Sequence, residues 1–162
     1  MVAAGKVPVD TGVRPGSNPA AAALADENTG AAMSSTEILV YPASITGPER
    51  PEVEGKFLQL SWRDQGYLVF AAFELYRYHN QILARFALEH GLTHRWVDAQ
   101  TLEVNAPQLA VHGGGRFRLN TRQQRLDLWD DSQVYGRFEE SGLAASIAAA
   151  AHPWRCFTIQ IG

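Results

Sequence analysis

The sequence predicts an α+β domain in which a single mixed β-sheet of about six strands has two helices packed against it. Short apolar runs typical of strands recur along most of the chain, and two stretches are typical of helices. The second helical stretch is followed by one last apolar run. The elements are therefore expected in the order strand, strand, helix, several strands, helix, strand.

Three strands are expected in the first part of the domain. A short apolar run at residues 38–41 predicts an edge strand. KFLQLSW (56–62) and YLVFAAF (67–73) are rich in aromatic and aliphatic residues and predict two further strands. The dipeptide Gln65-Gly66 between them predicts the turn.

Residues 78–90 predict the clearest helix. Four of their apolar side chains recur at helical spacing on one face: Ile82, Leu83, Phe86 and Ala87. Gly91 follows directly and predicts the end of this helix.

The pattern then returns to strands. HRWVD (94–98), LEVNA (102–106) and QLAVHG (108–113) predict three short ones. RFRLN (116–120) and RLDLWD (125–130) both alternate between apolar and polar residues. Because the polar sequence NTRQQ separates them, they predict a hairpin.

The C-terminal part predicts the second helix and a closing strand. The Ala-rich residues 141–151 predict the helix, with Ser141 as its N-cap and His152-Pro153 as its stop. WRCFTIQI (154–161) predicts a final buried strand.

The 162 residues allow one domain of ordinary size. Residues 1–35 are rich in Ala, Gly and Pro and poor in bulky apolar residues, so we expect a disordered leader there. The folded domain is then expected over residues 36–162.

Charge, hydropathy and cysteine content exclude several classes of partner. The 14 basic and 17 acidic residues give a net charge of -3, which does not favour nucleic acid. No apolar run approaches the roughly 20 residues that span a bilayer, so no membrane association is expected. The one cysteine, Cys156, cannot form an internal disulfide, which favours a reducing, cytoplasmic compartment. We expect the protein to be a monomer.

Among the five histidines, His79 is distinguished by its position. It lies near the start of the first predicted helix, where free backbone N–H groups and the helix dipole attract anions such as phosphate. An imidazole with an ordinary pKa of about 6.5 suits nucleophilic or proton-transfer chemistry near neutral pH. A purely structural histidine is the alternative interpretation. No His-x-His or His-Glu-x-x-His spacing is present, so no metal site is expected.

Two further segments contain residues suited to anion binding. In GGGR (113–116), three glycines allow the backbone to approach another group closely, and the arginine offers a fork for oxyanions. A tight turn or bulge between strands is the alternative. In SQVYG (132–136), a serine hydroxyl and successive N–H groups can form an anion-binding concavity, although alone the segment is also an ordinary loop.

Together, the histidine at a helix start, the GGGR segment and the S-x-x-Y-G segment resemble the janus family of protein histidine phosphatases, which are small and metal-independent. In that family a Tyr-His pair opens the first helix. Gly-Gly-Gly-Arg, Ser-x-x-Tyr-Gly, a helix and a closing strand follow. Here Tyr78-His79, residues 113–116 and residues 132–136 take those places. The resemblance covers roughly residues 37–162 and implies the family's fold.

The resemblance implies that the chain hydrolyses the P–N bond of phosphohistidine in proteins or peptides, without a cofactor. His79 is then the catalytic residue, either as the nucleophile or as the base that activates water. The resemblance also implies a substrate-binding set: Lys56, Tyr78, Asn80, Arg116, Ser132 and Val134. Lys56 is the one lysine of the predicted domain, in a chain with twelve arginines.

Departures from the family pattern motivate a second hypothesis. Residues 69–73 are apolar where the family usually has an arginine before its histidine. A non-catalytic, janus-like module that binds phosphate or a phosphoprotein is therefore the alternative, and a purely structural α/β protein is a third. The connection between Gly91 and Gly113 is also long, and we expect that it can add a hairpin near the site.

Overall fold

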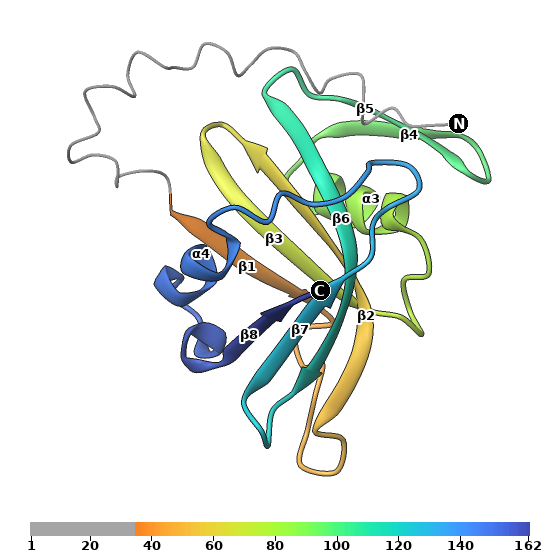
Figure 1. Cartoon of the computed structure of the whole chain (residues 1–162). Coiled ribbons are helices and arrows are strands. Elements are labelled where there is room, and N and C mark those ends of the chain that lie inside the picture. The colour runs from red at the N-terminus through yellow and green to blue at the C-terminus, as the bar shows by residue number, and fades with distance from the viewer. Residues whose placement is uncertain (1–34) are drawn as a thin grey trace, which may run out of the picture.

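The structure, a computed structural model, describes residues 35–162 as a six-stranded mixed sheet and a separate two-stranded hairpin (Figure 1). The prediction of a leader over residues 1–35 lies, apart from its last residue, outside the described residues. The strands are β1 (Thr36–Tyr41), β2 (Glu52–Trp62), β3 (Gln65–Ala72), β4 (Thr93–Asp98), β5 (Thr101–Asn105), β6 (Leu109–Asn120), β7 (Arg125–Trp129) and β8 (Thr158–Ile161). The helices are α3 (His79–Glu89), α4 (Leu143–Ala149) and the short 3-10 helix η2 (Pro153–Cys156).

The order of strands in the main sheet is β1-β3-β2-β6-β7-β8. The central strands pair antiparallel, whereas the edge strands β1 and β8 pair parallel with β3 and β7. The predicted coarse class, a mixed sheet of six strands with two helices, is therefore confirmed.

Two cores form because successive side chains of a strand point to opposite faces of the sheet. On β2, Phe57 packs into one core and Leu58 into the other. Helix α3 covers the Leu58 face through Ile82 and Phe86, and α4 covers the Phe57 face through Ile147. The two helices thus lie on opposite faces of the sheet (Figure 1).

The central strands are longer than predicted. β2 begins at Glu52, ahead of the predicted 56–62, because its early residues pair with the far end of β6. The strands predicted at 108–113 and 116–120 are one continuous strand, β6, with the glycine run in its middle. The hairpin predicted between β6 and β7 is confirmed.

The turn between β2 and β3 was predicted one dipeptide too late. Gln65 and Gly66 already belong to β3, and the turn residues are Arg63 and Asp64. Their positive φ angles of 55° and 66° match the tight hairpin turn whose twist suits a pair of antiparallel strands.

The ends of α3 agree with the sequence prediction, whereas the predicted N-cap of α4 does not. Helix α3 lies within the predicted 78–90, and Gly91 follows its end with a φ of 69°. The prediction of Ser141 as the N-cap of α4 is wrong, because Gly142, with a φ of 75°, occupies that position.

The closing strand is shorter than the predicted 154–161. Its first part forms η2, in which proline at the first turn supplies a backbone angle that suits a helix. The side chain of His152 accepts a hydrogen bond from the Trp154 N–H and stabilises this turn. β8 is therefore limited to Thr158–Ile161, and Cys156 is exposed.

The long connection between Gly91 and Gly113 does add a hairpin, β4–β5, as expected. Buried Leu102 and Val104 of β5 pack with the α3 core and hold the hairpin against the domain. No helix within residues 35–162 is long and apolar enough to cross a membrane.

Candidate functional site

A cavity of about 530 Å³ lies where the N-terminus of α3, the β4–β5 turn and the loop after β7 meet. Its lining residues are Lys56, Tyr78, His79, Asn80, Gln81, Ala99, Gln100, Asp130, Asp131, Ser132, Gln133 and Val134. This volume lies within the usual range for sites that bind small molecules or side chains.

His79, the first residue of α3, is the most buried charged or polar side chain of the cavity except for Ser132. Its Nε2 lies 3.0 Å from the carbonyl oxygen of Gly115. A carbonyl oxygen can only accept, so Nε2–H donates and the neutral ring keeps the lone pair on Nδ1. No residue in the described part of the chain forms a hydrogen bond with Nδ1, which is therefore available for chemistry at the cavity.

Burial lowers the pKa of His79 from its usual 6.5 to about 4. The Gly115 carbonyl favours the charged form and the nearby Lys56 ammonium disfavours it, whereas Asp130 and Asp131 favour it. His79 is consequently neutral near pH 7, and its Nδ1 then carries a lone pair and no proton.

The glycine run of β6 makes room for this histidine. A Cβ on Gly114 would lie 2.8 Å from His79 Cδ2 and 2.6 Å from the Phe57 carbonyl oxygen. Gly113 has a φ of 149° and would place a Cβ 2.2 Å from the Arg137 carbonyl oxygen. The run is therefore neither a turn nor a phosphate loop. It begins where the pairing of β2 with β6 shifts register, between Gln59 and Leu60, so the expected bulge is present at its start. From there it continues as a strand interior against which the His79 ring and the loop after β7 both pack.

The start of α3 supplies backbone donors to the cavity. Gln81 Oε1 accepts from the N–H of Tyr78 at 3.0 Å and from the N–H of Arg77 at 2.8 Å. Within residues 35–162, no acceptor is found for the N–H groups of His79 and Asn80, which are left for an anion at the positive end of the helix.

Lys56 supplies the only ammonium group among the residues that line this cavity. It lies on β2 opposite Arg116 of β6, and its Nζ is 6.0 Å from the centre of the exposed Tyr78 ring. Burial and the neighbouring Arg116 lower the pKa of Lys56, and Asp130 opposes them. A partly buried ammonium is screened less by water than an exposed one, so it attracts phosphate more strongly.

The loop after β7 carries Ser132, which is buried. The Ser132 hydroxyl accepts from the Tyr135 N–H at 3.1 Å, and its own hydrogen remains free to be donated. Ser132 and Gly136 exchange two backbone hydrogen bonds, of 3.1 and 2.8 Å. The N–H of Ser132 is thus occupied, whereas those of Gln133 and Val134 have no acceptor among the described residues.

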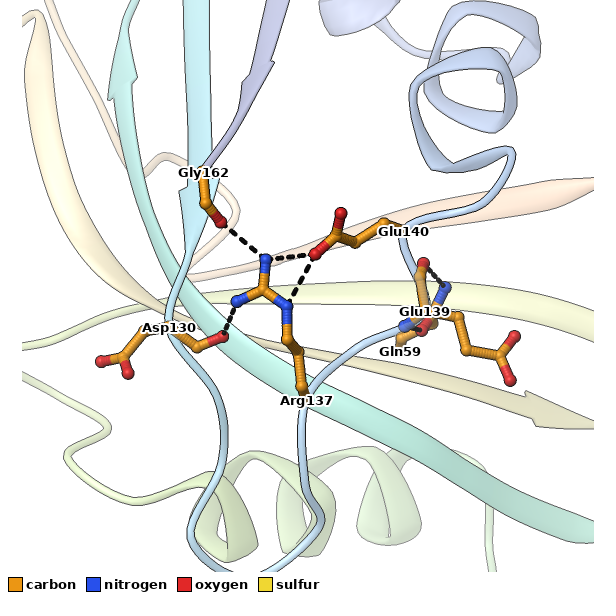
Figure 2. Close-up of polar contacts among 6 residues, drawn as sticks. All are labelled: Gln59, Asp130, Arg137, Glu139, Glu140 and Gly162. Atoms are coloured by element: carbon orange, nitrogen blue, oxygen red, sulfur yellow. Dashed lines mark hydrogen bonds and ion pairs between the residues drawn. The ribbon is translucent and has the colours of Figure 1, made fainter.

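Arg137 closes this loop at its base (Figure 2). It donates to the carbonyl oxygen of Asp130 at 3.0 Å and to that of Gly162 at 2.6 Å, and it also pairs with Glu140. Gln59 of β2 binds both backbone groups of Glu139, two residues further on. These contacts fix both ends of the segment that presents Ser132.

The β4–β5 hairpin forms another wall of the cavity. Asn80, in the first turn of α3, donates through Nδ2 to the Gln100 carbonyl oxygen at 2.8 Å. Ala99 and Gln100, at the hairpin turn, line the cavity. The side chain of Asn80 is therefore engaged with the hairpin, and its backbone N–H faces no described acceptor.

The structure brings six of the predicted site residues to one cavity: Lys56, Tyr78, His79, Asn80, Ser132 and Val134. Arg116 does not line it. Its guanidinium lies 4.0 Å from Glu54 and 4.0 Å from Asp130, so it contacts the cavity only through a carboxylate of the lining. No cluster of three or more metal-ligating His, Cys, Asp or Glu side chains is found within residues 35–162.

Three contributors were missed by reasoning from the sequence. Gln81 stands three residues after Tyr78, which is the spacing of a capping residue and was a usable signal. Asp130 lies two residues before the S-x-x-Y-G segment and Arg137 directly after it, but no local pattern indicates that one faces the cavity and the other closes the loop.

Comparison of the chain with models of known protein families and with curated proteins finds no match.

Proposed function

We propose that this protein is a phosphohistidine phosphatase that uses His79 as its catalytic residue and needs no metal ion. The observation that carries the proposal is the buried, neutral His79, whose Nε2–H is fixed by Gly115 and whose Nδ1 is left for the cavity. Lys56, the free N–H groups at the start of α3 and the Ser132 hydroxyl surround the same space.

In this proposal the phosphoryl oxygens bind to Lys56 and to the N–H groups of His79 and Asn80. Fixed donors of this kind stabilise the charge on a transferring phosphoryl group without reorganising. Ser132 donates its hydroxyl hydrogen from the opposite loop, so the phosphorus is held between two rigid elements.

The low pKa of His79 favours the nucleophilic role over the role of base. A group with a pKa of about 4 is a weak acceptor for a proton of water near pH 7. An unprotonated nitrogen remains able to attack phosphorus. The substrate P–N bond then breaks as the Nδ1–P bond forms, and the leaving imidazole takes a proton from solvent. Water next cleaves the Nδ1–P bond, which releases phosphate and restores His79.

The direct test follows a phosphohistidine peptide by 31P NMR, with and without EDTA. We expect the protein to release phosphate in both conditions and the His79→Ala variant to release none. His94→Ala is the matched control, because His94 bonds the Leu92 carbonyl oxygen and does not line the cavity. Rapid quenching of the wild type should also yield a phosphorylated His79 peptide by mass spectrometry.

Two outcomes would contradict the proposal in different ways. Tight binding of the peptide without release would favour the alternative function, a phosphoprotein-binding module. Neither binding nor release, or release that survives His79→Ala, would remove His79 from any catalytic role.

A further inference from the structure

Two carboxylates line the cavity beside the groups that would hold phosphate. Asp130 and Asp131 are consecutive and exposed, and they immediately precede Ser132. A second observation marks the same cavity as a ligand site: His79, only 4% exposed, lines it with an Nδ1 that has no hydrogen-bond partner among residues 35–162.

The carboxylate of Asp130 is not neutralised by the arginine that binds its backbone. Figure 2 shows that Arg137 contacts the Asp130 carbonyl oxygen, while the carboxylate points away from it. The nearest cation to that carboxylate is Arg116, at 4.0 Å, and Arg116 is shared with Glu54. Asp131 forms no ion pair with any described residue.

The lining is therefore more acidic than a site for a bare phosphate requires. At pH 7 it carries one ammonium, that of Lys56, against two carboxylates, because His79 is neutral. A phosphoryl group adds further negative charge. Positive charge on the substrate itself, next to the phosphoryl group, would offset this imbalance.

We infer that Asp130 and Asp131 select phosphohistidine segments in which Lys or Arg flanks the phosphorylated residue. The inference rests on the proposed function and names its substrate class, a basic phosphorylated peptide segment. The phosphoryl group occupies the side of Lys56 and the start of α3, and a flanking cationic side chain pairs with the carboxylates at the exposed edge. A cavity of about 530 Å³ has room for part of a neighbouring side chain beside a phosphorylated imidazole.

The test compares two phosphohistidine peptides that differ only in flanking Lys or flanking Gln. For the wild type at low salt, we expect the basic peptide to have the higher kcat/KM and the lower Kd, by roughly fivefold, as for two exposed ion pairs. The double variant Asp130→Asn, Asp131→Asn should bring both ratios close to one. Asparagine tolerates the φ of 74° at residue 130, so the loop should keep its shape. Asp127→Asn is the matched control, because Asp127 pairs with Arg125 on β7 and does not line the cavity.

The two ideas fail separately. Turnover of the Gln-flanked peptide reports the proposed function, whereas the ratio between the peptides reports the role of the carboxylates. If neither peptide is hydrolysed, the ratio of their Kd values, measured by fluorescence anisotropy, still tests whether the carboxylates select basic flanking residues. Equal ratios in the wild type and the double variant, or a wild-type preference for the Gln-flanked peptide, would overturn the inference.

Discussion

Replacing Gly114 by alanine tests whether the glycine run of β6 sets the position of the His79 ring. The added Cβ would lie 2.6 Å from the Phe57 carbonyl oxygen, 2.8 Å from His79 Cδ2 and 3.0 Å from His79 Nε2. Ordinary contact begins at 3.4 Å, so the ring would have to retreat by about 0.6 Å. The Phe57 carbonyl belongs to a central strand of a close-packed sheet and has little room to move.

The magnitude follows from two costs. Overfilling a packed interior costs about 1–3 kcal/mol. Lengthening the bond from His79 Nε2 to Gly115 O forfeits up to about 1 kcal/mol more. We therefore expect the free energy of unfolding to fall by about 1–4 kcal/mol. Because a misplacement of about 1 Å costs roughly 100-fold in rate, we expect kcat of the folded variant to fall by roughly 10- to 100-fold.

Urea unfolding measures the stability, and phosphate release per folded molecule measures the rate. Gly47→Ala is the matched control, since a Cβ there meets nothing within 4 Å. The control should change the free energy of unfolding by less than about 0.5 kcal/mol. A Gly114→Ala variant as stable and active as the wild type would refute the steric argument. One that loses stability but keeps the full rate would refute the link to His79.

Three further predictions concern pH, the loop and the β2–β3 turn. Burial places the pKa of His79 at about 4, below the usual 6.5, so between these values the unfolded chain binds more protons than the native state. The free energy of unfolding, measured by urea titration, should fall by about 2 kcal/mol from pH 7 to pH 5. The same fall should be smaller in His79→Asn. An equal fall in the variant and the wild type would contradict the lowered pKa of His79. Arg137→Gln removes the bonds to Asp130 and Gly162, so hydrogen exchange at the Ser132 and Gly136 amides should accelerate by roughly tenfold, but not in the control Arg125→Gln. Equal exchange in the two variants would show that Arg137 does not hold the loop. Asp64→Gly relieves a positive φ of 66° and should raise the free energy of unfolding by about 0.5 kcal/mol in urea, whereas a loss would exclude strain at this turn.

The elements that could be predicted are those whose cause is local. The spacing of Ile82, Leu83 and Phe86 is set by a helical face that must be buried, and these residues are buried in α3. The turn at Arg63-Asp64 could not be predicted in the same way. Aspartate tolerates positive φ, but arginine is not a usual choice for it, and the pairing of β2 with β3 imposes that conformation on both residues.

The glycine run shows why part of the site could not be derived from the sequence. Three glycines in a row allow a turn, a bulge or a strand interior, and only contacts from elsewhere in the chain distinguish these. The contacts come from His79 and from Arg137, which lie before and after the run in the sequence. In the same way, Arg116 contacts Glu54 and Asp130 because of the cross-strand register, which no short motif encodes.

The pairing of β2 with β6 also determines when the cavity can come into existence. This ladder places Lys56 opposite Arg116 and brings together segments separated by α3 and the β4–β5 hairpin. Closing such a long loop is entropically costly, so this pairing is slow compared with helix formation. The loop that carries Ser132 follows both β6 and β7 in the sequence, so it is synthesised after them. A chain in which this ladder has not formed lacks the cavity, and a nascent chain acquires it only after the loop beyond β7 has left the ribosome. Occupancy of the cavity would therefore count only molecules in which the β2–β6 ladder and the loop beyond β7 are both in place, which makes a bound ligand a reporter of that assembly.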